Sequence, residues 1–116
     1  MKNIIESKSF HFSVRIVRLV RYIRKTHKEY TLTEQLLRSG TSIGANVAEA
    51  EQGHSRADFI AKANIALKEA AETRYWLRLM HATELLTKRE YDSMLSDCEE
   101  LIKLLVSIIK TAKIGR

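Results

Sequence analysis

Proline is absent from the 116-residue chain, and cysteine, glycine and aromatic residues are scarce. Without proline, the commonest interruption of a long helix is excluded. The single cysteine, Cys98, excludes a disulfide within the chain, and its apolar neighbours indicate a small core residue. No signal-peptide pattern occurs, and no apolar run approaches the roughly 20 residues that span a bilayer. These absences predict a helical, soluble protein in a reducing cytoplasm.

Charge is plentiful and unevenly distributed. Twenty Lys and Arg residues against fourteen Asp and Glu residues give a net charge of +6. The first 28 residues contain eight basic side chains and one acid, Glu6. This excess favours an acidic partner, nucleic acid before an anionic membrane.

Short polar breaks near residues 28–31, 52–55 and 81–87 divide the chain into four amphipathic segments. Ser55 with Asp58, and Thr87 with Glu90, resemble the capping boxes that begin helices. We therefore predict helices over residues 8–28, 32–51, 56–81 and 88–113. Connections this short place consecutive helices side by side, so the expected fold is all-α: an antiparallel up-down-up-down four-helix bundle, with residues 1–116 as one domain.

The first predicted helix separates its apolar side chains from its basic ones at about 100° per residue. Its basic side has six cations and no acid: Arg15, Arg18, Arg21, Arg24, Lys25 and Lys28. A solvated helix face would have the same pattern. The alternative is an electrostatic stripe that binds phosphate groups or an acidic protein.

The second predicted helix contains Gly40 and Gly44, each of which costs roughly 1 kcal/mol relative to alanine. With Ala48 they form a flank of small residues, against which a neighbouring helix can pack closely. The alanine-rich third helix is the expected neighbour. Close packing of these two helices would then offset the two glycines.

Polar side chains line the other flank of the second helix and one face of the third. An unpaired buried polar group costs roughly 1–3 kcal/mol, so we predict a hydrogen-bonded network that fixes the register of the two helices. Its members are Arg38, Ser42, Asn46 and Glu49 on the second helix and Lys68, Glu69 and Glu72 on the third. The alternative is that these groups only face water.

The fourth predicted helix is apolar over about half of its circumference, which is more than the roughly 100° stripe that faces a core. We expect this surplus, with the Trp76 side of the third helix, to form a contact between subunits.

Signs of catalysis or metal binding are weak. The chain has one Glu-x-x-His motif, Glu51 to His54, where a di-iron bundle needs two. A serine nucleophile at Ser39 or Ser42 would need an adjacent base, and only carboxylates and Lys68 are expected nearby. We expect no metal, no cofactor and no enzymatic activity.

Two long motifs, QLLRSGTSIGANVAEA (residues 35–50) and SRADFIAKANIALKEAAETRYWLRLM (residues 55–80), resemble the small bacterial four helix bundle proteins, also called 23S rRNA intervening sequence proteins. The chain is also similar to the accessory proteins of diversity-generating retroelements, which are basic scaffolds that bind nucleic acid and a reverse transcriptase. The resemblance implies a ring-like homopentamer with no assigned activity. The motif residues carried over are Arg38, Ser39, Ser42, Asn46, Glu49, Lys68, Glu69, Glu72 and Trp76.

The sequence therefore favours a non-enzymatic homo-oligomer that binds RNA or another nucleic acid through the cations of its first helix, with no membrane partner. The alternative is an adaptor or structural ring that binds an acidic protein and makes no direct contact with nucleic acid. Few aromatic residues are available for base stacking, and Tyr22 and Tyr30 are the nearest to the cations. Weak sequence specificity is expected.

Overall fold

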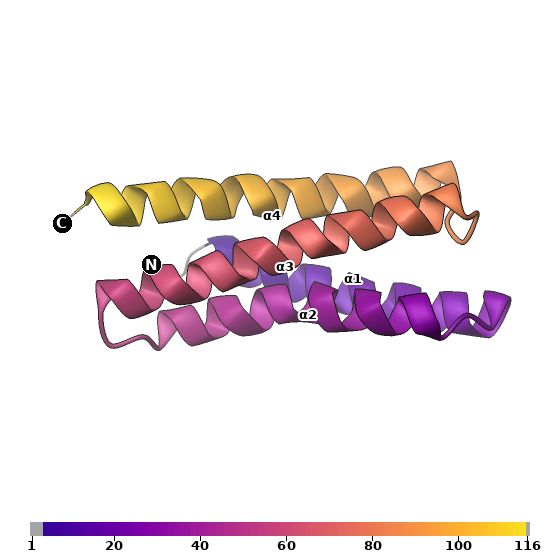
Figure 1. The fold of residues 1–116 in the computed structure, drawn as a ribbon, viewed down its shortest axis with the longest axis horizontal. Helices are drawn as coiled ribbons and strands as arrows, with labels where there is room; N and C mark the ends of the chain where they lie inside the picture. The colour runs from indigo at the N-terminus through magenta and orange to yellow at the C-terminus, as the bar shows by residue number, and fades with distance from the viewer. Residues whose placement is uncertain (1–3, 116) are drawn as a thin grey trace.

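The computed structural model describes residues 4–115, and all their regular structure is helical (Figure 1). The helices are α1 (Ile4–His27), α2 (Thr31–Glu51), α3 (Arg56–Ala82) and α4 (Lys88–Ile114). No strand occurs in this range, which confirms the all-α class. The first helix begins four residues earlier than predicted, and every other boundary agrees to within one residue.

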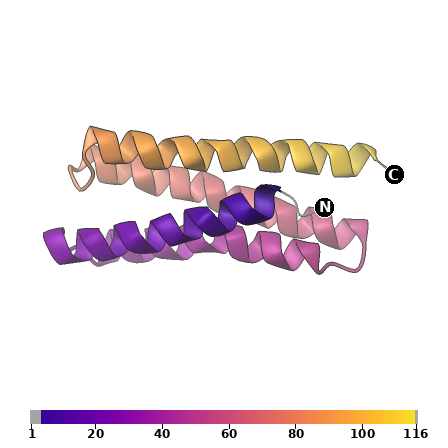
Figure 2. The ribbon, with the colours of Figure 1, turned by 180° about the vertical axis from the view of Figure 1, so that it is seen from behind.

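The four helices lie lengthwise beside one another in a body of 49 × 21 × 20 Å (Figures 1 and 2). Each helix packs closely against the next along the chain, whereas α1 and α4 touch more sparsely. Within the described residues, no helix is both long and apolar enough to cross a membrane.

Local capping interactions explain where the later helices begin. Ser55 Oγ accepts a hydrogen bond from the Asp58 N–H at 3.1 Å. At the start of α4, Thr87 Oγ1 accepts from the Glu90 N–H at 3.2 Å, and Glu90 Oε1 accepts from the Thr87 N–H at 2.9 Å. This reciprocal pair confirms the predicted capping box.

One continuous core joins the inward faces of all four helices. Its largest fully buried side chains include Phe12, Ile16, Leu36, Ile43 and Leu77. On α4, the inner part of the apolar arc is buried, and Leu95, Ile102, Leu104 and Ile108 are half-buried. A single chain therefore covers much of the arc that the sequence analysis assigned to a contact between subunits.

The glycines of α2 pack against α1, so the prediction that they face α3 is wrong. A Cβ atom added to Gly40 would lie 2.7–2.9 Å from three side-chain atoms of Ile16. One added to Gly44 would lie 3.2 Å from the backbone oxygen of Ser9. The small residues permit close approach of two helix backbones, as expected. The spacing of residues along one helix, however, does not identify which helix packs against it.

Cys98 lies in the core, and its thiol donates a hydrogen bond to the Ala70 carbonyl at 3.3 Å. Burial raises the pKa of this thiol to about 12. The predicted structural role for Cys98 agrees with this environment, because a thiol held in its neutral form is a poor nucleophile.

Candidate functional site

Two of the six predicted cations form ion pairs with other helices of the bundle. Arg15 Nη1 lies 2.7 Å from Asp97 Oδ2, and Arg15 Nη2 lies 2.8 Å from Ser93 Oγ, so this side chain joins α1 to α4. Arg24 joins α1 to α2: its Nε donates to Thr33 Oγ1 at 2.9 Å, and its Nη2 lies 3.1 Å from a carboxylate oxygen of Glu34. The positive charges of both arginines are therefore paired with carboxylates of the same chain.

The other four cations are exposed, and within residues 4–115 none of them has an acidic partner. Lys28 Nζ donates to the Lys25 carbonyl at 3.0 Å, close to the negative end of the α1 dipole. Arg18, Arg21 and Lys25 occupy one face of the helix, because residues three, four and seven apart lie on the same side. We call these three residues the α1 cation stripe.

A groove of about 330 Å³ lies beside this stripe, between α1 and α4. Its lining combines apolar and charged side chains: Arg15, Arg18, Leu19, Tyr22, Glu90 and Met94. Tyr22 is 50% exposed, while Met94 is buried. Tyr30, the other tyrosine near the cations, instead lies beneath Arg24, whose guanidinium carbon is 5.8 Å from the ring centroid.

The predicted polar network is present at its centre. Arg38 forms ion pairs with Glu69 at 3.3 Å and with Glu72, and Trp76 Nε1 donates to Glu72 Oε2 at 2.9 Å. This part is partly exposed, since 46% of the Arg38 side chain is accessible. It joins α2 and α3 at the rim of their contact.

A fully buried pair lies deeper in the same contact: the hydroxyls of Ser39 and Thr73 are 2.9 Å apart, and neither residue is accessible. The Thr73 hydroxyl also lies 2.8 Å from the Glu69 carbonyl. Thr73 was missed in the sequence analysis. Its spacing four residues after Glu69 and three before Trp76 places it on the same helix face and could have identified it.

Other predicted members do not join the network, and for them the prediction is wrong. Ser42 Oγ donates to the Arg38 carbonyl at 2.6 Å, and Asn46 Nδ2 donates to the Ser42 carbonyl at 2.8 Å. Short polar side chains satisfy themselves locally in this way, on the backbone of their own helix. Glu49 pairs with Lys62 at 2.6 Å, whereas Lys68 is exposed and has no acidic partner within the described range.

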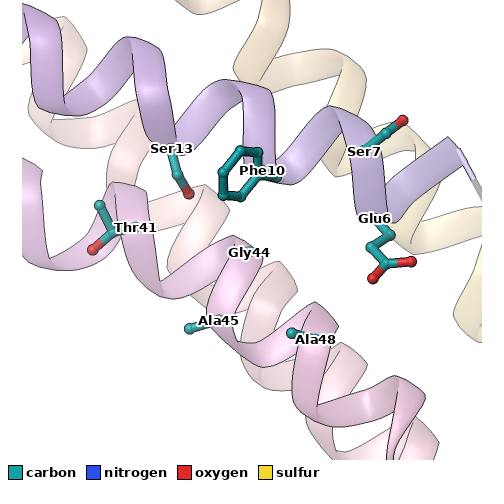
Figure 3. A pocket seen from close by; sticks show the side chains of 8 residues that line it. All are labelled: Glu6, Ser7, Phe10, Ser13, Thr41, Gly44, Ala45 and Ala48. Carbon is teal, nitrogen blue, oxygen red and sulfur yellow. The ribbon is translucent and has the colours of Figure 1, made fainter.

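A second groove, of about 630 Å³, lies between α1 and α2 on the outer surface (Figure 3). Phe10 on α1 and the small residues Gly44, Ala45 and Ala48 on α2 form half of its lining. Phe10 is 70% exposed, which makes it one of the most exposed large apolar side chains of the described chain. Such an apolar groove is typical of a surface that binds another molecule.

Metal-binding chemistry finds little support in this arrangement. Over the described residues, no group of three His, Cys, Asp or Glu side chains is placed to hold a metal ion. Glu51 and His54, the pair in the Glu-x-x-His motif, are both exposed.

Comparison with known proteins agrees with the fold. The family model described as 23S rRNA-intervening sequence protein matches residues 1–107. A crystal structure from Bacteroides thetaiotaomicron, described as a protein with unknown function from the S23 ribosomal protein family, is 56% identical. The alignment covers 93% of this chain and all of that one, with a TM-score of 0.92. No curated protein matches the chain.

Proposed function

The chain belongs to the 23S rRNA-intervening sequence protein family, and we propose that it is a non-enzymatic homo-oligomer that binds RNA or another nucleic acid through the α1 cation stripe. The observation that carries this proposal is the exposure of Arg18, Arg21 and Lys25 on one helix face, with no acidic partner among the described residues. These charges are available to phosphate groups without the loss of an internal ion pair. The resemblance to retroelement accessory proteins also favours nucleic acid.

The spacing of the stripe suits a nucleic-acid backbone. Arg18 and Lys25 are seven residues apart, so their Cα atoms are separated by roughly 10 Å along the helix axis. Successive phosphates along a nucleic-acid strand are closer together than this, so the stripe can contact more than one phosphate. Contacts to phosphate have no base specificity, and binding is therefore expected to depend weakly on sequence.

Self-association is the second part of the proposal. The subunit is an antiparallel up-down-up-down bundle, as the short connections at residues 28–30, 52–55 and 83–87 favour. Five subunits form a ring, as the family resemblance implies. The groove around Phe10 is the proposed contact with a second copy, because water-exposed apolar area of this kind is stabilised by burial in an interface.

A charge-reversal experiment tests nucleic-acid binding. The test variant replaces Arg18, Arg21 and Lys25 with glutamate, and the control makes the same replacement at Lys103, Lys110 and Lys113, which are exposed cations of α4. Each variant has a net charge of zero, so the two differ only in where the charge is lost. Arg15 is left intact, because its ion pair with Asp97 stabilises the contact between α1 and α4.

The measurement is fluorescence anisotropy of a labelled RNA strand at increasing salt. Wild type and control should bind, with log K falling by roughly 0.7 per neutralised phosphate for each log unit of salt, and the α1 variant should not bind. Undiminished binding by the α1 variant, or an equal loss in both variants, would contradict a role for the stripe. If the wild-type protein did not bind RNA but retained one acidic protein, the alternative function as a protein-binding adaptor would be favoured.

The oligomer is tested by light scattering coupled to size exclusion. Phe10→Glu places a charge in the proposed contact and should shift the mass toward that of a single 13.4 kDa chain. Tyr75→Glu is the matched control, because Tyr75 is 54% exposed on α3, beside Trp76. If the Tyr75→Glu oligomer dissociated while the Phe10→Glu oligomer stayed intact, the subunit contact would instead lie on the α3 surface expected from the sequence.

A further inference from the structure

Tyr22 is a partly exposed aromatic side chain within the cationic surface of α1. It follows Arg18 by one helical turn, so the two side chains are neighbours on the helix surface. No hydrogen bond or ring contact of Tyr22 is present within residues 4–115. Tyr30 is 57% exposed, but the Arg24 guanidinium lies over its ring and it does not line the groove beside the stripe. Tyr22 is therefore the tyrosine that borders both the stripe and the groove.

The groove beside Tyr22 provides an apolar surface next to this ring. Leu19 and the buried Met94 line it, and its volume of about 330 Å³ lies at the lower end of the range of about 300–1,000 Å³ for small-molecule pockets. A flat heterocycle has the size and the polarity for such a site. It can contact the Tyr22 ring on one face while its edges remain hydrated.

Both acidic groups near the groove are engaged in contacts within the chain. Glu90 lines the groove, but its carboxylate accepts the Thr87 N–H in the capping box. Asp97 faces Arg15 at 2.7 Å, so this pair is nearly neutral as a whole. Arg18, which also lines the groove, has no such partner within the described residues.

We infer that the groove between α1 and α4 is a nucleobase site, in which an unpaired base stacks on Tyr22 while Arg18 and its neighbours in the stripe hold the adjacent phosphates. This inference rests on the proposed function and makes it more specific: the ligand is single-stranded nucleic acid. A duplex keeps its bases stacked inside, where Tyr22 cannot reach them. Every base has a π-face, so the site accepts different bases.

The test compares two single strands that have the same number of phosphates: a 12-nucleotide oligothymidylate and an abasic strand of equal length. Wild type, Tyr22→Leu and Tyr22→Phe are titrated with each fluorescent strand at one low salt concentration. Stacking on an aromatic side chain contributes enough that the base-containing strand should bind about 5- to 150-fold more tightly than the abasic one. Tyr22→Phe keeps the ring and should keep this preference.

Tyr22→Leu should reduce the preference to near unity while its binding of the abasic strand stays the same, because the leucine leaves the cations in place. Circular dichroism checks that this exposed substitution leaves the helices intact. Equal binding of both strands by wild type, or an unchanged preference in Tyr22→Leu, would overturn the nucleobase site and leave phosphate binding standing. Failure of wild type to bind either strand would overturn the proposed function itself, and the nucleobase site with it.

Discussion

Replacement of Gly40 by alanine tests how closely α1 and α2 are packed. In a helix with free space around it, this change stabilises the fold by roughly 1 kcal/mol, because alanine has the higher helix propensity. Here the new methyl group would lie 2.7–2.9 Å from three atoms of Ile16, which is fully buried. These distances are too short for carbon atoms, so Ile16 or the helix backbone has to move.

The packing effect is the larger of the two. An extra methyl group in a well-packed core costs about 1–3 kcal/mol. After the propensity gain is subtracted, Gly40→Ala should lower the free energy of unfolding by up to about 2 kcal/mol. In an Ile16→Ala background the three close atoms are absent, and the same change should raise the free energy of unfolding by about 1 kcal/mol. The two substitutions should therefore couple by about 1–3 kcal/mol.

The assay is urea unfolding followed by circular dichroism for the wild type, both single variants and the double variant. All four are compared at one protein concentration, because self-association makes stability depend on concentration. If Gly40→Ala stabilised the protein equally in the wild-type and the Ile16→Ala backgrounds, close packing against α1 would be refuted. If Gly40→Ala were instead coupled energetically to a substitution of Ala70, the glycines would pack against α3, as the sequence analysis expected.

Three further predictions follow from individual side chains. Thr73→Val leaves the buried Ser39 hydroxyl without its partner and should cost about 1–3 kcal/mol of stability in urea unfolding, of which Ser39→Ala in the same chain should recover a part. Glu84 has a φ of 69°, which favours glycine, so Glu84→Gly should raise the free energy of unfolding by about 1 kcal/mol; a decrease would contradict the assigned strain. Burial raises the pKa of the Cys98 thiol from 9.0 to about 12, so between these values the unfolded chain binds fewer protons than the folded one, and stability should fall as pH rises. Wild type should therefore lose more stability than Cys98→Ala above pH 9, and equal losses would argue against the buried neutral thiol.

The candidate site was only partly predictable from the sequence. The spacing of basic residues identified all six cations, but it did not show that two of them are paired within the chain. Arg15 pairs with Asp97 of α4 and Arg24 with Glu34 of α2, and both contacts depend on how the helices pack. The centre of the polar network was predicted for Arg38 and its two glutamates. Ser42 and Asn46 were misassigned, because a side chain that can bond its own helix needs no partner on another.

The sequence by itself determined the number of helices, nearly all of their ends, the N-cap at Ser55 and the capping box at Thr87, because these depend on interactions within a few residues of the chain. The tertiary structure decided which helix Gly40 meets, which cations remain available to a ligand, and that Tyr22 borders a groove while Tyr30 lies beneath an arginine. The physical reason is that helix periodicity defines the faces of a rod but not its rotation against its neighbours. That rotation results from the packing of all four helices together, and it determines which side chains meet.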